Sequence, residues 1–267
     1  MIALLQVITL SDIQQQRECY MNELLYAQEL NTEENVQECK YYKIEENSIW
    51  VGYICVDSNK TLWEFYLVKD AMLHSQEIFK FLIDMNYINS AECITYDHVF
   101  FSLCLDFKKK SSCSAYVFRD NIAVNYPTIK YDNISMRLAT KEDYNSLLEI
   151  NKIAEGWNDF FSDLDKQIQM KEVFVFHSGN ELLGAGTCKK TWQCRNYYDI
   201  GMVVASKYRN KGIGTYIILK LKEYCYSNNQ IPVCGCWYPN YPSKKTLEKA
   251  GFIANHRVIR FEFEGEK

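Results

Sequence analysis

Short apolar runs bounded by turn residues dominate the first 120 positions, and this pattern is typical of a strand ladder. Glu-Asn and Asp-Ser-Asn-Lys turns separate the early runs. Apolar residues at helical spacing indicate one helix over residues 11–30, with Ser11 as its cap, and a second over residues 75–86. The predicted strands of this half cover residues 40–44, 49–56, 62–68, 92–96, 99–107 and 115–118. The charged run at residues 108–110 is interpreted as a solvated turn rather than a phosphate site.

The second half alternates strands with longer helical patterns. Thr140-Lys-Glu-Asp143 resembles a capping box before a helix that carries Tyr144, Leu147 and Leu148. Further helices are predicted over residues 159–170, 215–227 and 243–250, with Gly251 as a C-terminal cap. Strands are predicted at residues 134–138, 173–177, 182–191, 197–205, 233–238, 252–254 and 258–263, with a tight hairpin turn at 178–180.

The length and the distribution of glycine both indicate two domains. A chain of 267 residues exceeds the size of about 250 at which single cores usually stop growing. Only Gly52 falls in the first 150 positions, whereas the other ten of the 11 glycines follow residue 155. Residues 125–133 contain the first proline and two Asn/Asp clusters, a composition typical of a linker. We therefore place the boundary near residue 132 and expect domains at 1–132 and 133–267.

The overall composition is that of a folded globular chain, with 48% hydrophobic and 24% charged residues. The net charge of −4 gives no general reason to expect nucleic-acid binding. Charge is nevertheless divided, because residues 1–132 carry a net −8 and residues 133–267 a net +4. The second half is therefore the expected place for an anionic ligand.

The cysteine pattern favours free thiols in the cytoplasm. The 11 cysteines are odd in number, and residues 1–10 lack a cationic leader or cleavage site. No C-x-x-C spacing occurs, and Cys234 and Cys236 alternate along a predicted strand. With four scattered histidines a metal site is not expected. No apolar run of about 18 residues is present, so no membrane span is predicted either.

The segment with most chemical information follows the predicted strand 197–205. It reads Arg209-Asn-Lys-Gly212-Ile-Gly214 and leads directly into an amphipathic helix. Two glycines at this spacing let successive backbone N–H groups face one point at a helix N-terminus, and Arg209 and Lys211 add positive charge. Such a site fits a pyrophosphate. The alternative interpretation is a glycine turn that only starts a helix.

These residues and the order of elements resemble the GNAT superfamily of acyl-CoA-dependent N-acetyltransferases. Its pyrophosphate loop, Arg/Gln-x-x-Gly-x-Gly/Ala after the fourth strand, is matched by Arg209, Gly212 and Gly214. A second signature, an Asn, a small residue three positions on and then Gly-Phe, is matched from Asn240 and Ser243 to Phe252. The resemblance covers residues 134–263 and implies an α/β fold: a mixed, mostly antiparallel central sheet flanked by helices.

The resemblance also implies roles for individual residues around acetyl-CoA as co-substrate. Backbone N–H groups of the loop would hold the pyrophosphate, the pantetheine arm would lie along the strand before it where two strands splay, and Asn240 and Ser243 would line the same channel. For Asn240 a simple turn and helix start stays an alternative. The implied cofactor-binding residues are Met202, Val203, Val204, Arg209, Asn210, Lys211, Gly212, Ile213, Gly214, Thr215, Asn240 and Ser243.

Catalytic groups are less well defined by the resemblance. Many relatives place a tyrosine acid seven residues after the asparagine, and here that position is Leu247. Tyr238 and Tyr241 flank Asn240 and are the candidate replacements, with packing as the alternative role of each. Asp199 is the candidate base on the fourth strand, although spacing places it one residue from the expected position. A structural carboxylate at the strand end is its alternative.

The first half repeats the order of hairpin, strand, helix and strand but lacks the glycine loop. Residues 69–75, Lys-Asp-Ala-Met-Leu-His-Ser, stand in its place with side chains that would block a phosphate. We interpret this half as a smaller, degenerate GNAT-like α/β domain that shapes the acceptor site. The predicted function is N-acetyl transfer from acetyl-CoA to a primary amine of a small molecule or peptide, with no nucleic-acid or membrane partner. The alternatives are a non-catalytic acyl-CoA-binding or regulatory protein and a structural scaffold.

Overall fold

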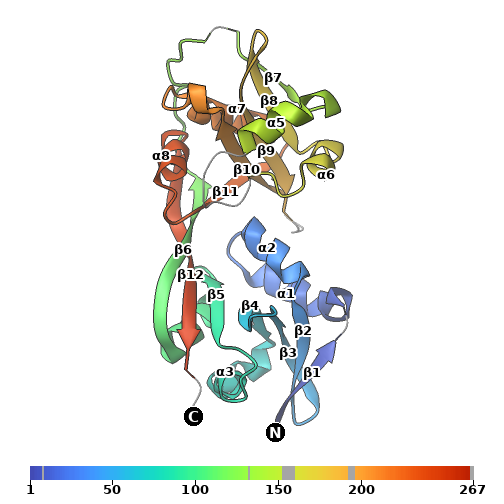
Figure 1. The fold of residues 1–267 in the computed structure, drawn as a ribbon. Coiled ribbons are helices and arrows are strands. Elements are labelled where there is room, and N and C mark those ends of the chain that lie inside the picture. The colour runs from blue at the N-terminus through green and yellow to red at the C-terminus, as the bar shows by residue number, and fades with distance from the viewer. Residues whose placement is uncertain (8, 132, 152–159, 192–195, 265–267) are drawn as a thin grey trace. The chain divides into compact units, whose positions relative to one another are not determined.

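The structure is a computed structural model that describes all residues except 8, 132, 152–159, 192–195 and 265–267 (Figure 1). The chain divides into a first unit, Met1–Val117 with Gly235–Pro239 and Asn255–Lys267, and a second unit, Phe118–Cys234 with Asn240–Ala254. This differs from two consecutive segments meeting at residue 132. The difference arises because the strands β6 (Lys108–Asp120), β11 (Ile231–Trp237) and β12 (Phe252–Phe263) each contribute residues to both units.

The first unit is built on the strand order β1-β2-β3-β4-β5-β12-β6. The pairs β1/β2, β2/β3, β3/β4 and β5/β12 are antiparallel, whereas β4 and β5 are parallel. Its strands are β1 (Ile2–Val7), β2 (Lys40–Glu46), β3 (Ile49–Val56), β4 (Thr61–Leu67), β5 (Ser90–Ile94), β6 (Lys108–Asp120) and β12 (Phe252–Phe263). Its helices are η1 (Leu10–Ile13), α1 (Gln14–Glu23), α2 (Leu30–Gln37), η2 (Lys69–His74), α3 (Ser75–Asp84) and α4 (His98–Phe107).

Alternate residues of the central strands pack on opposite layers of helices. Ile54 and Phe65 belong to the cluster formed with Phe79 of α3 and Phe100 of α4. Their neighbours along the strands, Tyr53 and Tyr66, belong instead to the cluster formed with α1 and α2. Because successive side chains of a strand point to opposite faces, this sheet is buried on both sides. Every residue of β4 is buried as a result.

Three predictions for the first unit were wrong at particular elements. The helix expected over residues 11–30 ends where Leu24 adopts an extended conformation, and α2 follows as a separate helix. Residues 98–107 form α4 rather than a strand, since the Asp97 side chain caps the helix by accepting from the Phe100 N–H. Residues 108–110 begin β6 instead of forming a turn, although their side chains are exposed. The strand β1 was not predicted.

The second unit is a sheet in the order β11-β10-β9-β8-β7, in which only β10 and β11 are recorded as a parallel pair. Its strands are β7 (Ser135–Leu138), β8 (Val173–Ser178), β9 (Glu181–Lys190), β10 (Tyr197–Val204) and β11 (Ile231–Trp237). Its helices are η3 (Lys141–Asp143), α5 (Tyr144–Asn151), α6 (Leu164–Gln169), η4 (Ser206–Tyr208), α7 (Ile213–Ser227) and α8 (Tyr241–Lys249). The predicted capping box at Thr140 and Asp143 is confirmed. The predicted strands 252–254 and 258–263 are one strand, β12. The helix expected over 159–170 is shorter: residue 159 lies outside the described part, residues 160–163 are not helical, and α6 begins at Leu164 after the Asp163 cap.

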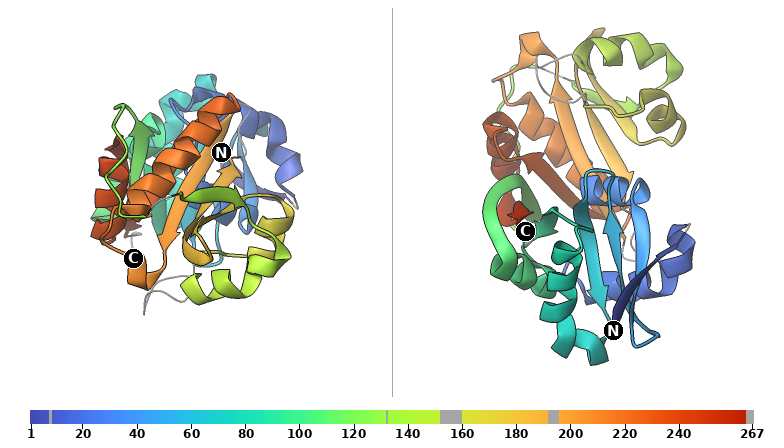
Figure 2. Two further views of the ribbon diagram at one scale, coloured as in Figure 1. Left: turned by 90° about the horizontal axis from the view of Figure 1, so that it is seen from above. Right: turned by 60° about the horizontal axis from the view of Figure 1, so that its bottom comes forward.

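Glycines in β9 allow α7 to lie close against this sheet (Figure 2). A Cβ atom at Gly184 would come within 2.9 Å of Ile217 Cδ1, and one at Gly186 within 2.7 Å of Leu221 Cδ1. One turn further along the helix, the Sγ atoms of Cys188 and Cys225 are 3.6 Å apart. These contacts fix α7, and therefore the loop that precedes it, relative to β10.

Among the helices of the described residues, none is long and apolar enough to cross a membrane. The ten cysteines of the described part are all unbridged.

Candidate functional site

The loop between β10 and α7 has the backbone geometry of an anion cradle. After the short turn η4, Asn210 and Gly212 both adopt left-handed conformations, with φ of 58° and 80°. Gly212 is the N-cap of α7, and its carbonyl accepts the N–H of Tyr216. The N–H groups of Ile213, Gly214 and Thr215 therefore have no partner within the helix and point out of its N-terminus. Three donors and the positive end of the helix dipole meet at this point.

Both glycines of the loop stand where a side chain would meet neighbouring atoms. A Cβ atom at Gly212 would lie 3.2 Å from Ile129 Cγ2, in addition to the strain of its left-handed φ. At Gly214 it would lie 3.0 Å from Thr246 Cγ2 of α8. The absence of side chains keeps the backbone at the helix start open to close approach. The residues thus fit a pyrophosphate.

The cationic residues of the loop are exposed and anchored through part of their side chains. Arg209 Nε donates to the carbonyl of Val204 at 3.2 Å, which ties the loop to the end of β10. Lys211 Nζ donates to the Lys207 carbonyl at 2.9 Å and to the Tyr131 hydroxyl at 3.1 Å. Asn210 is also exposed. Two full positive charges therefore stand beside the N–H groups in contact with solvent.

Ile213 and Thr215 take part in this site through their backbone alone. Their side chains are 1% and 6% exposed and pack inside the second unit. The buried side chains of Ile213 and Thr215 thus anchor the helix start, while the glycines leave the N–H groups accessible. Within this short segment, buried side chains stabilise the helix start and glycines expose the backbone.

The strands next to the loop diverge. The parallel pairs recorded between β10 and β11 are Tyr197 with Ile231, Tyr198 with Pro232 and Asp199 with Val233. Beyond Asp199, β10 continues to Val204 in register with β9 only, as far as the described residues show. Met202, Val203 and Val204, the residues predicted to lie along the pantetheine arm, are therefore on this unpaired stretch. An unpaired strand edge can accept amides of an extended ligand.

Asn240 is the N-cap of α8. Its Oδ1 accepts the N–H of Ser243 at 3.1 Å, and both residues are half-buried. Asn240 therefore starts a helix, which is the alternative role that the sequence offered for it beside cofactor binding. The bond from the Ser243 N–H uses one of the two lone pairs of Oδ1, so the second lone pair and the two donors of the amide nitrogen could still bind a ligand.

Asp199 lies on the face of β10 that points away from α7. It shares this face with Gly201, whose Cβ position is near Phe160, whereas Val204 is near Gly214 on the α7 side. Its partner across the ladder is Lys189 of β9. Asp199 thus stands where the parallel pairing ends, at the beginning of the splay.

The two candidate phenols belong to different units. Tyr238 is in the first unit, where its ring stacks on Tyr116 with centroids 4.8 Å apart. Tyr241 is the first residue of α8 in the second unit, and 57% of it is exposed. Leu247 is buried to 1% exposure in the core behind α8. The position at which relatives carry a tyrosine is a packing position here.

Sequence reasoning missed the segment that lies against the glycine loop. Tyr131 packs edge-on against Tyr208 at 5.4 Å, and Tyr126 packs against Tyr216 of α7 at 5.4 Å. Ile129 is the neighbour of Gly212 described above. These contacts connect residues about 80 positions apart. The aromatic residues within 125–133, the segment predicted to be a linker, were the sequence feature that could have indicated this packing.

The connection from β4 to α3 in the first unit, all of it described, has no such glycine loop. Where β4 leads toward α3, the chain forms the 3-10 helix η2, which begins after Val68 and carries the side chains of residues 69–74. The recorded parallel pairs of β4 and β5 are Thr61 with Ser90 and Leu62 with Ala91, so these strands also diverge. The splay is present in both units, and the glycine cradle is present in the second.

Comparison with known families agrees with this geometry. A family model described as "Acetyltransferase (GNAT) domain" matches residues 9–121, and one described as "Acetyltransferase (GNAT) family" matches residues 138–252. The chain therefore contains two acetyltransferase-type domains in tandem. It belongs to the GNAT acetyltransferase superfamily, whose members transfer an acetyl group from acyl-CoA.

Solved structures show the same fold over the whole chain. An acetyltransferase of the GNAT family from Colwellia psychrerythraea superposes with a TM-score of 0.89 at 24% identity, covering 98% of this chain and 100% of that one. A tandem GNAT protein from the clavulanic acid biosynthesis pathway superposes with a TM-score of 0.62 at 11% identity over 100% of both chains. The sequence matched no protein of curated function. These likenesses establish the predicted α/β fold, with a mostly antiparallel sheet flanked by helices.

Proposed function

We propose that the protein transfers the acetyl group of acetyl-CoA to a primary amine of a small molecule or peptide. The observation that carries this proposal is the glycine cradle at the start of α7, placed beside the unpaired end of β10. In the proposed complex the N–H groups at the start of α7, those of Ile213, Gly214 and Thr215, hold the pyrophosphate, and the preceding loop residues Arg209, Asn210, Lys211 and Gly212 surround it. Met202, Val203 and Val204 pair with the pantetheine arm, and Asn240 and Ser243 line its channel.

The chemistry is a direct attack. The neutral amine nitrogen forms a bond to the thioester carbonyl carbon, the C–S bond then breaks, and the amine's proton passes to a base while the thiolate takes up a proton. We assign the base to Asp199 and the acid to Tyr238 or Tyr241. A backbone N–H near Val204 is the proposed donor to the developing oxyanion.

The test is release of CoA thiol from acetyl-CoA in the presence of a panel of primary amines. Release with at least one amine supports the enzyme, whereas binding of CoA without release supports the rival, a non-catalytic acyl-CoA-binding protein. A chain that neither binds CoA nor releases thiol would be a scaffold. Calorimetric titration with CoA separates the last two outcomes.

Removing the phenol that serves as acid is expected to slow turnover without affecting CoA binding. We expect either Tyr238→Phe or Tyr241→Phe to lower kcat roughly tenfold to a hundredfold. This is at or below the low end of general-acid assistance, because water can still protonate a thiolate. Tyr224→Phe, near the far end of α7, is the matched control and is expected to keep parental kcat. Parental turnover in both variants would remove the phenols from the mechanism.

The acceptor is expected to be cationic, because residues 1–132 carry a net −8. Attraction between charges weakens as the Debye length falls from about 30 Å at 0.01 M salt to about 3 Å at 1 M. The Michaelis constant of a cationic acceptor should therefore rise with ionic strength, while that of an aromatic amine that is neutral at the assay pH stays constant. A flat profile for both would contradict the idea.

We further propose that the protein works in the cytoplasm. The support is its thiol chemistry: the ten described cysteines are unbridged, as is usual in a reducing compartment. The first unit, which lacks the glycine cradle, is proposed to serve the acceptor rather than the pyrophosphate.

A further inference from the structure

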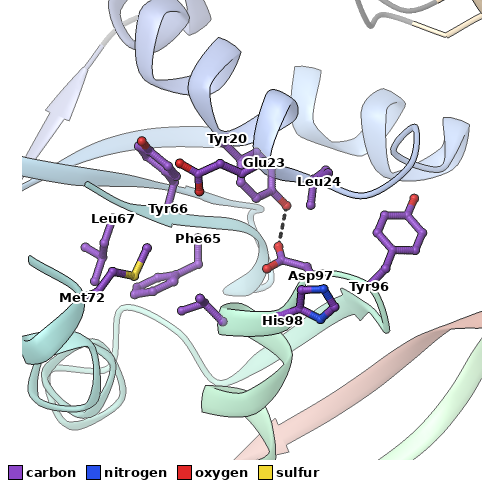
Figure 3. Close-up of a pocket in the computed structure, with 11 residues that line it drawn as sticks. Tyr20, Glu23, Leu24, Phe65, Tyr66, Leu67, Met72, Tyr96, Asp97 and His98 are labelled. Atoms are coloured by element: carbon purple, nitrogen blue, oxygen red, sulfur yellow. Dashed lines mark hydrogen bonds between the residues drawn. The ribbon is translucent and has the colours of Figure 1, made fainter. Parts of the chain in front are cut away.

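A cavity of about 110 Å³ lies in the first unit, where β4 and β5 diverge (Figure 3). Its volume corresponds to about four water molecules at the roughly 30 Å³ that each occupies in the liquid. It is distinct from the glycine cradle, since all of its lining residues belong to the first unit. These residues are Tyr20, Glu23, Leu24, Phe65, Tyr66, Leu67, Met72, Tyr96, Asp97, His98 and Val99.

The polar end of this cavity is a buried carboxyl group. Asp97 is 7% exposed and accepts hydrogen bonds from the Tyr20 hydroxyl at 2.8 Å and from the Phe100 N–H at 3.2 Å. Both donors are neutral. Within the part of the chain that the structure describes, no cationic side chain lies within ion-pair distance of Asp97 or of Glu23.

The nearby guanidinium is already neutralised. Arg17 is paired with Glu64, with Nη2 and Oε1 2.8 Å apart and both side chains almost fully buried. Among the lining residues, His98 carries the only basic side chain. The cavity therefore has two acidic groups, Glu23 and Asp97, that no fixed cation balances.

The apolar part of the cavity lining combines aromatic rings with aliphatic side chains. Tyr20, Phe65, Tyr66 and Tyr96 contribute rings, and Figure 3 shows the Tyr20 hydroxyl directed at Asp97. Aromatic faces attract cations, and the attraction strengthens where water is excluded. Aromatic rings beside a carboxylate are an arrangement that binds organic ammonium groups.

We propose that this cavity binds a small primary ammonium ion through the carboxylate of Asp97 and the surrounding aromatic rings. The volume admits a chain of about three carbons with its ammonium group. The site goes beyond the proposed acetyl transfer and does not depend on it. Burial raises the pKa of Asp97 to about 7, and the charges of Glu64 and Glu23 add to this, so a bound cation would lower the pKa and stabilise the ionised form.

The test compares n-propylammonium with 1-propanol, its neutral counterpart of the same size. Each is titrated into the whole protein at pH 8 in phosphate buffer and followed by ligand-observed NMR. At this pH the amine is charged and Asp97 is largely ionised. We expect a dissociation constant on the order of 1 mM for the ammonium ion and no saturation by the alcohol. Equal saturation by both would overturn the proposal, since the cavity would then be merely apolar.

Asp97→Asn is the decisive variant, because asparagine retains the cap of α4 and removes the charge. It should weaken n-propylammonium binding at least about tenfold. Asp163→Asn is the matched control, since Asp163 caps α6 in the second unit by accepting from the Lys166 N–H at 3.1 Å. Parental affinity in Asp97→Asn would overturn the proposal.

If Asp97→Asn does not fold, Glu23→Gln provides a second test. Glu23 is exposed on one side of the cavity, so this substitution should not affect folding. It should weaken binding about two- to fivefold, and an unchanged affinity in that case would contradict the site. A variant with valine at Gly212 and Gly214 should retain n-propylammonium binding. This result separates failure of the ammonium site from failure of the proposed acetyl transfer.

Discussion

Replacing Gly212 and Gly214 together with valine is expected to weaken CoA binding at least about 100-fold, or about 2.7 kcal/mol. At Gly214 even the first carbon of a side chain would meet Thr246 Cγ2 at 3.0 Å, and a branched side chain must turn toward the N–H groups or displace α8. At Gly212, where φ is 80°, valine would shift the backbone that aims those groups. Titration calorimetry with CoA measures the effect directly.

Gly179→Val controls for backbone strain in this experiment. Gly179 has a φ of +57° and nothing within 4 Å of its Cβ position, so valine there imposes left-handed strain without steric contact. This variant should bind CoA with parental affinity. If the double variant also did so, the cradle would be only a helix start, and the proposed function would lose the observation that carries it.

The glycine loop could be predicted from the sequence because its chemistry is local. A strand end, two glycines and a helix start lie within about 20 residues, and backbone geometry follows from residue type at such positions. Family membership followed from the same few residues together with Asn240 and Ser243. The elements of the second unit were predicted nearly completely for a related reason, since its strands are separated by strong turn and capping signals.

Helix α4 could not be predicted in this way. The apolar run from Val99 to Phe107 fits a buried strand as well as a buried helix, and periodicity alone does not separate them. Here the Asp97 cap and the packing of Phe100 and Leu103 on α3 and β4 determine the result. The contact of Ile129 with the glycine loop could not be predicted either, because it depends on how distant segments meet.

The ion pair of Arg17 and Glu64 is the clearest example of structure that local sequence does not reveal, because its members are 47 positions apart. Arg17 Nε lies 3.1 and 3.0 Å from the two carboxylate oxygens, and Nη2 also donates to Gln28 Oε1 at 3.3 Å. The hydroxyl of Tyr53 donates to Glu64 as well, at 3.1 Å. The carboxylate is fully enclosed by these donors, so its charge depends on Arg17.

Arg17→Met is therefore expected to destabilise the first unit by about 3–5 kcal/mol, since it leaves an uncompensated buried carboxylate. Amide hydrogen exchange of β3 and β4 measures the opening free energy of this unit without assuming that the whole chain unfolds in one step. Lys80→Met is the matched control, because its partner Asp84 and Lys80 itself are both exposed, and it should cost less than about 1 kcal/mol.

Removing both charges distinguishes a lost ion pair from lost packing. In the double variant Arg17→Met with Glu64→Leu, no buried charge remains, and most of the stability lost in Arg17→Met should return. If the double variant were instead as unstable as the sum of the two single variants, the two side chains would act independently. The stability of the first unit would then rest on the packing of α1 against β4, and the pair would have no energetic role of its own.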